Sequence, residues 1–126
     1  MNFPKQIQQL ASDLNKKLAD ISFPAPVAYV YNAFDYAFNG YVAYTNKFAQ
    51  GNKRVLLLGM NPGPWGMSQT GVPFGEIPSV REWMGLDANI GQPSPEHPKR
   101  PVQGFACNRS EVSGRRLWGF FAEHFG

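Results

Sequence analysis

The stretch that decides the fold is Gly59-Met-Asn-Pro-Gly-Pro-Trp-Gly-Met-Ser-Gln-Thr-Gly-Val-Pro-Phe-Gly75, which follows the apolar run Val55-Leu-Leu-Leu58. A short apolar run of this kind predicts a buried strand. Repeated glycine and proline can neither continue a strand nor build a helix. We therefore expect a rigid loop at the end of a core strand, where α/β proteins form ligand sites. Its amide, Asn61, and its aromatic ring, Phe74, suit a flat, neutral, polar ligand such as a nucleobase.

Composition indicates one globular domain with a basic C-terminal part. The chain has 126 residues, of which 43% are hydrophobic, so it can bury a core. Residues 1–96 carry seven Lys/Arg and seven Asp/Glu, whereas residues 97–126 carry five Lys/Arg against two Glu. The whole net charge of +3 therefore lies in the last 30 residues. This excess indicates either a solvated basic face or contact with an anionic partner.

Cysteine and histidine are too sparse for several kinds of site. The single cysteine, Cys107, excludes an internal disulfide, a Cys-ligated iron–sulfur cluster and a Cys₄ zinc site within this chain. His97 and His124 lack ligand-like spacing, so we expect no metal. The first residues lack a signal-peptide core, and no apolar run approaches the length that spans a bilayer. We therefore expect an intracellular protein.

Local patterns predict four helical segments around one convincing strand. Residues 4–20 repeat apolar side chains at helical spacing, and residues 41–49 place three aromatic rings on one face. A short helix is expected over residues 79–86, followed by a proline-rich irregular connection over 87–106. A last helix is expected from Ser110, with an aromatic face.

The Gly59–Glu76 segment resembles the first active-site motif of the single-strand-selective monofunctional uracil-DNA glycosylases. Further resemblance flanks it on both sides, and together these matches run from about residue 20 to the end of the chain. The flanking matches are Tyr29-Val-Tyr-Asn32, Glu96-His-Pro-Lys-Arg-Pro101, Glu111-Val-Ser-Gly114 and Trp118-Gly-Phe-Phe121.

The resemblance implies an α/β fold, with three α/β/α layers around a parallel sheet. It implies hydrolysis of the N-glycosidic bond of uracil and modified uracils in single- or double-stranded DNA, in base excision repair and without a cofactor. Residues 1–126 would then be the N-terminal part of a single domain, with only the first strand of the sheet. The implied partner is DNA, for a monomer in the nucleus of a eukaryote or the cytoplasm and nucleoid of a bacterium.

The resemblance also assigns roles within the loop. Asn61 corresponds to the residue that positions the attacking water, and Phe74 to the ring that stacks on the flipped base. Met60 and Gly63 would shape the pocket, and Met67 would lie near the C5 side of the base. From charge alone, four residues are candidates for phosphate contacts: Lys99, Arg100, Arg115 and Arg116.

One departure from the family limits the expected activity. The second family motif, His-Pro-Ser-Pro, supplies a catalytic histidine and is absent here, since Pro93-Ser-Pro-Glu-His97 has similar letters in another order. We therefore expect a truncated, poorly active or inactive piece of a glycosylase. The alternative is a non-catalytic module that binds DNA or a base. A dinucleotide-binding domain is disfavoured, because Pro62 and Pro64 remove N–H donors that a pyrophosphate would need.

Overall fold

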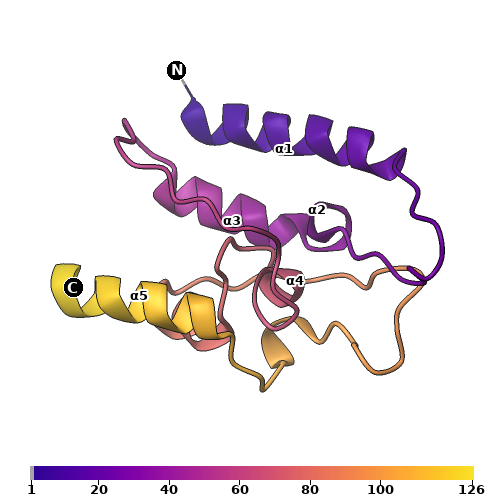
Figure 1. Cartoon of the computed structure of the whole chain (residues 1–126). Helices are drawn as coiled ribbons and strands as arrows, with labels where there is room; N and C mark the ends of the chain where they lie inside the picture. Colours follow the sequence, from indigo (N-terminus) through magenta and orange to yellow (C-terminus); the bar gives the residue numbers. More distant parts are fainter. Residues whose placement is uncertain (1) are drawn as a thin grey trace.

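A computed structural model describes residues 2–126 as helices joined by long irregular segments (Figure 1). In chain order the elements are α1 (Phe3–Ala19), α2 (Ala33–Tyr36), α3 (Phe38–Phe48), α4 (Met67–Thr70), the π-helical turn η1 (Ser79–Trp83), the 3₁₀ turn η2 (Gly104–Ala106) and α5 (Val112–Phe125). The helices predicted for residues 4–20, for 41–49 and from Ser110 are therefore confirmed as α1, α3 and α5. Within residues 2–126 no helix is long and apolar enough to cross a membrane.

The predicted parallel sheet is wrong for this structure. Residues 2–126 contain no strand, so the expected α/β fold with three α/β/α layers is not observed. The run Val55–Leu58 is irregular, and its four side chains are between 45% and 90% exposed. A strand is stable only when neighbouring strands pair its N–H and C=O groups, and no other described segment lies beside this run as a strand. The apolar pattern of Val55–Leu58 predicted a strand, but such a pattern does not show whether other strands are present to pair with it.

Helix α1 is specified locally at both ends. The side chain of Asn2 accepts a hydrogen bond from the backbone N–H of Lys5 at 3.2 Å, and proline occupies the first turn. Lys16 and Lys17 lie in the last turn, where positive charge interacts favourably with the helix dipole. The helix packs on α2 and α3, and the Gln8 amide donates to the Thr45 hydroxyl at 2.8 Å.

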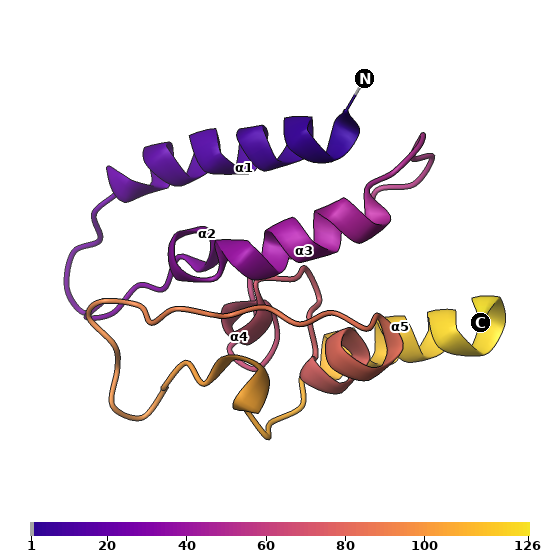
Figure 2. The same ribbon diagram turned by 180° about the vertical axis from the view of Figure 1, so that it is seen from behind.

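The Gly/Pro loop packs against the start of α3 through backbone contact. Gly71 has a φ of +74°, and a Cβ added there would overlap the carbonyl group of Ala37. A Cβ added at Gly40 would in turn overlap the carbonyl oxygen of Thr70. Only glycine permits this approach from both sides. Helix α4 and the loop therefore lie directly below α2 and α3, as both views show (Figures 1 and 2).

The main core lies between the loop, η1 and α5. Its buried members are Val72, Val80, Met84, Leu86 and Trp118, and the partly buried rings of Phe74, Phe105 and Phe121 pack against them. Trp118 contacts Phe121 edge-to-face, with ring centroids 5.7 Å apart. Helix α5 thus uses Trp118 as its anchor, whereas Phe120 and Phe125 on the same helix remain exposed.

Gln69 joins the loop to the segment that precedes η2. Its side chain is 2% exposed, and its amide nitrogen lies 3.1 Å from the carbonyl oxygen of Pro64 and 3.2 Å from that of Pro101. Its amide oxygen accepts from the backbone N–H groups of Gln103 at 2.8 Å and Gly104 at 3.1 Å. One buried amide therefore forms hydrogen bonds to four backbone groups in two segments that are far apart in the sequence.

Replacing this amide should destabilise the protein strongly. We expect Gln69→Leu to lower the free energy of unfolding by at least about 2 kcal/mol, because each buried polar group left without a partner costs about 1–3 kcal/mol. Urea denaturation followed by circular dichroism measures the change. The control is Gln50→Ala at an exposed position, expected to stay within about 0.5 kcal/mol. Equal effects of the two substitutions would contradict the role of Gln69.

Candidate active site

The five loop residues predicted to form a base pocket line one cleft of about 520 Å³. This cleft, called here the Asn61 cleft, opens between the Gly/Pro loop and the start of α5. Its lining consists of Phe34, Leu58, Gly59, Met60, Asn61, Pro62, Gly63, Met67, Phe74, Glu111 and Ser113. The surface is mostly apolar with one amide and one carboxylate, which is typical of sites for small, flat ligands.

Asn61 presents an unused acceptor at this cleft. Its side-chain nitrogen donates to the carbonyl oxygen of Pro62 at 3.0 Å, which orients the amide. Within residues 2–126 no donor lies within hydrogen-bonding distance of its Oδ1 atom. A neutral oxygen in this position can accept a hydrogen bond from a water molecule and orient that water.

Phe74 is held in an unfavourable backbone conformation. Its φ is +53°, a left-handed value that is uncommon for any residue other than glycine and costs about 1–3 kcal/mol. The Nε1–H group of Trp118 donates to its carbonyl oxygen at 2.7 Å, and the N–H of Glu76 does so at 2.9 Å. Its ring lies against Gly59, since a Cβ there would be 3.1 Å from Cζ. Strain maintained by surrounding contacts is common at ligand sites.

Glu111 brings the first turn of α5 to the glycines of the loop, a contact that the sequence motifs did not identify. Its carboxylate accepts from the backbone N–H groups of Ser113 at 3.3 Å and Gly114 at 2.7 Å, so it caps the helix. A Cβ added at Gly63 or Gly66 would lie 3.1–3.2 Å from the Glu111 side chain. The lack of a side chain at Gly63 therefore leaves room for the side chain of Glu111, which lines the cleft.

Met60 and Met67, the two methionines predicted to shape the base pocket, differ in their exposure. Met60 is 99% exposed at the edge of the cleft, whereas Met67 begins α4 and is only partly exposed. Both side chains line the Asn61 cleft. Their predicted roles in shaping a base pocket remain predictions, as do those of Asn61, Gly63 and Phe74.

The four predicted phosphate-binding cations lie on two separate elements. Lys99 and Arg100 belong to a turn, and Arg100 lines a second cleft that also contains Asn61. Arg115 and Arg116 lie on α5, and Arg115 lines a different hollow together with Glu76 and Glu82. The excess of positive charge in the sequence could not show that Arg100 and Arg115 line different hollows, because that depends on the fold.

A further cation near the loop was not among the predicted contacts. The Arg109 guanidinium lies over the ring of Trp65, with its carbon 4.6 Å from the ring centroid. Gln69, which also lines the second cleft, was missed as well. No three His, Cys, Asp or Glu residues come together as a potential metal site in the part of the chain that the structure describes.

Comparison with known proteins finds similarity to uracil-DNA glycosylases. The chain is 55% identical over 108 residues to the single-strand selective monofunctional uracil-DNA glycosylases of Rattus norvegicus and Mus musculus, and 54% identical to that of Bos taurus. The match covers 86% of this chain. The resemblance seen in the Gly59–Glu76 motif is thereby confirmed, and this chain is a relative of the single-strand selective enzymes.

The similarity covers only part of those relatives. The matched region is 39–40% of their length, so the chain spans well under half of the proteins it resembles. No protein-family model matches the chain.

The contact between α5 and Phe74 predicts opposite effects for two glycines of one helix. A Cβ at Gly114 would overlap the carbonyl oxygen of Phe74 and crowd Glu76, whereas a Cβ at Gly119 would meet nothing within 4 Å. We expect Gly114→Ala to cost about 1–3 kcal/mol of stability through overpacking. Gly119→Ala should add about 0.5–1 kcal/mol by restricting the unfolded chain. Thermal and urea unfolding of both variants measure this, and stabilisation by both would contradict the packing described.

Proposed function

We propose that this chain carries the water-positioning and base-stacking part of a uracil-DNA glycosylase site. The reaction would be hydrolysis of the N-glycosidic bond of uracil or a modified uracil in DNA, as a step of base excision repair. The observation that carries this proposal is the Asn61 cleft, where Asn61 and Phe74, from the segment that resembles a uracil-DNA glycosylase motif, line one hollow.

Asn61 would act on the attacking water. Its free Oδ1 accepts a hydrogen bond from water, whose oxygen then forms the new bond to C1′ of the deoxyribose while the bond between C1′ and the base nitrogen breaks. The bonding electron pair leaves with the base, and a proton from the water is released or transferred to it. No strong general base is required, because the sugar develops positive charge before the water bonds to it.

Phe74 would hold the extruded base by stacking. Bringing a base out of a DNA stack costs a few kcal/mol, and stacking on an aromatic ring returns about 1–3 kcal/mol. The left-handed backbone at Phe74 places its ring beside Gly59, within the same cleft as Asn61. Met60, Gly63 and Met67 would then limit the shape of the base, with Met67 near its C5 position.

The proposed activity of this chain by itself is low. Negative charge develops on the base as the bond breaks, and a positioned hydrogen-bond donor for such charge contributes about 2.7–4 kcal/mol. No histidine belongs to the described residues that line the Asn61 cleft. We therefore propose a rate at least about a hundredfold below that of a full-length relative. Residues 1–126 would act as the N-terminal part of one domain, as an intracellular monomer.

The second candidate function is a non-catalytic module that binds DNA or a base. The same missing donor favours it, because the cleft keeps the groups that bind a base and lacks one that supports bond cleavage. Lys99, Arg100, Arg115 and Arg116 would supply phosphate contacts in either case. The two functions differ in one observable, the release of free uracil.

Uracil release from a single-stranded oligonucleotide separates the two functions. With protein in excess over DNA, the chain should release uracil at least about a hundredfold more slowly than a full-length relative. Asn61→Ala should abolish this release while retaining binding, because the variant keeps the stacking ring. Phe74→Ala should weaken binding to uracil-containing DNA by roughly tenfold, the equivalent of about 1.4 kcal/mol.

The control for these variants is Gly119→Ala, which lies on α5 with open space around it and outside the Asn61 cleft. It should leave both release and binding unchanged. Release at the rate of a full-length relative would refute the proposed low activity. Release that persists unchanged in Asn61→Ala would refute the assignment of Asn61, and no release at all, with binding intact, would favour the non-catalytic module.

A further inference from the structure

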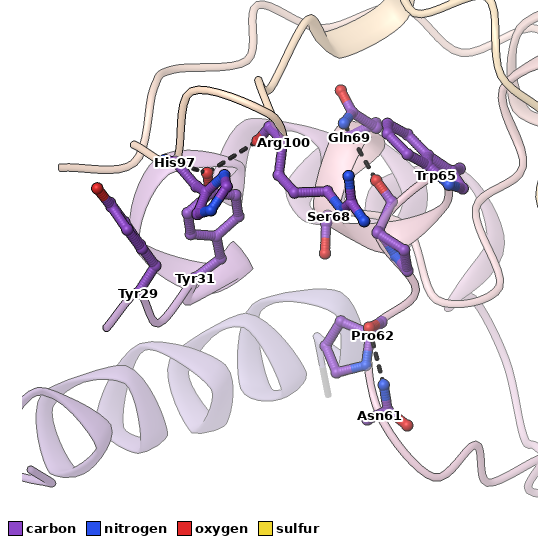
Figure 3. Close-up of a pocket in the computed structure, with 10 residues that line it drawn as sticks. Tyr29, Tyr31, Asn61, Pro62, Trp65, Ser68, Gln69, His97 and Arg100 are labelled. Atoms are coloured by element: carbon purple, nitrogen blue, oxygen red, sulfur yellow. Dashed lines mark hydrogen bonds between the residues drawn. The ribbon is translucent and has the colours of Figure 1, made fainter. Parts of the chain in front are cut away.

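A second cleft of about 490 Å³ is lined by residues from three separate parts of the chain (Figure 3). We call it the Arg100 cleft. Its lining residues are Tyr29, Tyr31, Asn61, Pro62, Pro64, Trp65, Ser68, Gln69, His97 and Arg100. The lining thus combines aromatic rings with cationic and polar side chains, and Asn61 and Pro62 belong to the lining of both clefts.

One wall of this cleft is a turn that is fixed by a distant tyrosine. The backbone N–H of Arg100 donates to the carbonyl oxygen of His97 at 3.0 Å, which closes the turn His97-Pro-Lys-Arg100. The hydroxyl group of Tyr31 accepts from the N–H of His97 at 2.7 Å and donates to the carbonyl oxygen of Arg100 at 2.8 Å. Both ends of the turn are therefore held at the cleft before any ligand binds.

The turn presents hydrogen-bond donors suited to an anion. The N–H of Lys99 donates to Nδ1 of His97 at 3.0 Å, so in neutral His97 the proton resides on Nε2, which is left as a donor. Arg100 donates from Nη1 to the carbonyl oxygen of Lys99 at 2.9 Å. No carboxylate lies within 4.0 Å of its guanidinium among the described residues, whose ion pairs are Lys16–Asp13 and Arg81–Glu82. Most of its N–H groups therefore remain available to a phosphate.

Aromatic rings accompany these donors. Tyr29 contacts the ring of His97 edge-to-face, with centroids 4.7 Å apart, and Trp65 lies across the cleft beneath the Arg109 guanidinium. Rings interleaved with cations are the pattern by which proteins bind single-stranded nucleic acid, since each base stacks on a ring while phosphates contact the cations. An isolated small anion would not need these rings.

We propose that the Arg100 cleft binds the nucleotide adjacent to the extruded one on the same single DNA strand. Arg100 and Nε2–H of His97 would contact its phosphate, and its base would stack on Trp65 or Tyr29. The shared wall of Asn61 and Pro62 supports this placement, because a strand leaving the Asn61 cleft meets the Arg100 cleft directly. This inference rests on the proposed function of the Asn61 cleft.

The test is equilibrium binding of the whole chain to a labelled single-stranded oligonucleotide of thymidines, followed by fluorescence anisotropy over a range of salt concentrations. Arg100→Gln should weaken binding about tenfold at low salt, and should reduce the slope of log affinity against log salt by about 0.7 for one lost phosphate contact. Trp65→Leu should weaken binding about tenfold with the salt slope unchanged, because stacking releases no counterions.

The matched control is Lys17→Gln, which removes the same charge from α1, outside both clefts. It should change neither affinity nor slope appreciably. Circular dichroism establishes that each variant retains its helices. If Arg100→Gln changes the slope no more than Lys17→Gln does, the proposal is overturned, as it is if single-stranded RNA of the matching sequence binds more tightly than the DNA.

A second oligonucleotide with one central uracil distinguishes this proposal from the proposed function. One outcome is that the uracil does not increase affinity, whereas Arg100→Gln and Trp65→Leu still weaken binding to the thymidine strand. This outcome would support the Arg100 cleft as a binding site for single-stranded DNA and would refute base binding in the Asn61 cleft. If uracil increases affinity through Phe74 but neither substitution in the Arg100 cleft has an effect, only the adjacent-nucleotide site is refuted.

Discussion

Apart from the single helical turn α4, the loop that forms the site is irregular, so its shape depends on buried polar side chains that satisfy its backbone. Gln69 serves four backbone groups, and the buried hydroxyl of Thr70 accepts from the N–H of Val72 at 3.2 Å. Glu76, 3% exposed, accepts from the N–H of Ser79 at 3.0 Å and from the hydroxyl of Ser110 at 2.9 Å. These contacts fix the loop against η1, η2 and the start of α5, and both clefts are formed from the surfaces left between these segments.

The sequence predicted those features that depend on neighbouring residues. Helical spacing identified α1 and α3, and one continuous motif contained Asn61 and Phe74, which the structure places in one cleft. The sheet could not be predicted reliably from Val55–Leu58, because strand pairing depends on other segments. Gln69 and Glu111 were missed for a related reason: their partners lie up to 35 and 48 residues away, at Gly104 and Gly63. Nothing local to a glutamine or a glutamate indicates such contacts.

The two clefts have different linings, although residues 58–65 contribute to both. Asn61 faces an apolar hollow with Phe74, where a neutral flat ligand loses little by leaving water. A few residues further on, Trp65 faces donors that favour negative charge. The prolines at positions 62 and 64 keep this segment stiff, so a ligand in one cleft would have a defined distance and direction to the other.

The exposed run Val55–Leu58 also affects how the protein behaves in concentrated solution. Four successive apolar residues with unpaired backbone groups form a segment that can stack with identical segments of other molecules into cross-β structure. Lys53 and Arg54 immediately precede this run and place two positive charges beside it. Charges in that position oppose such stacking, because they would be brought together in every layer. Lys53 and Arg54 thus occupy the flanking position in which charged gatekeeper residues oppose aggregation of an apolar segment.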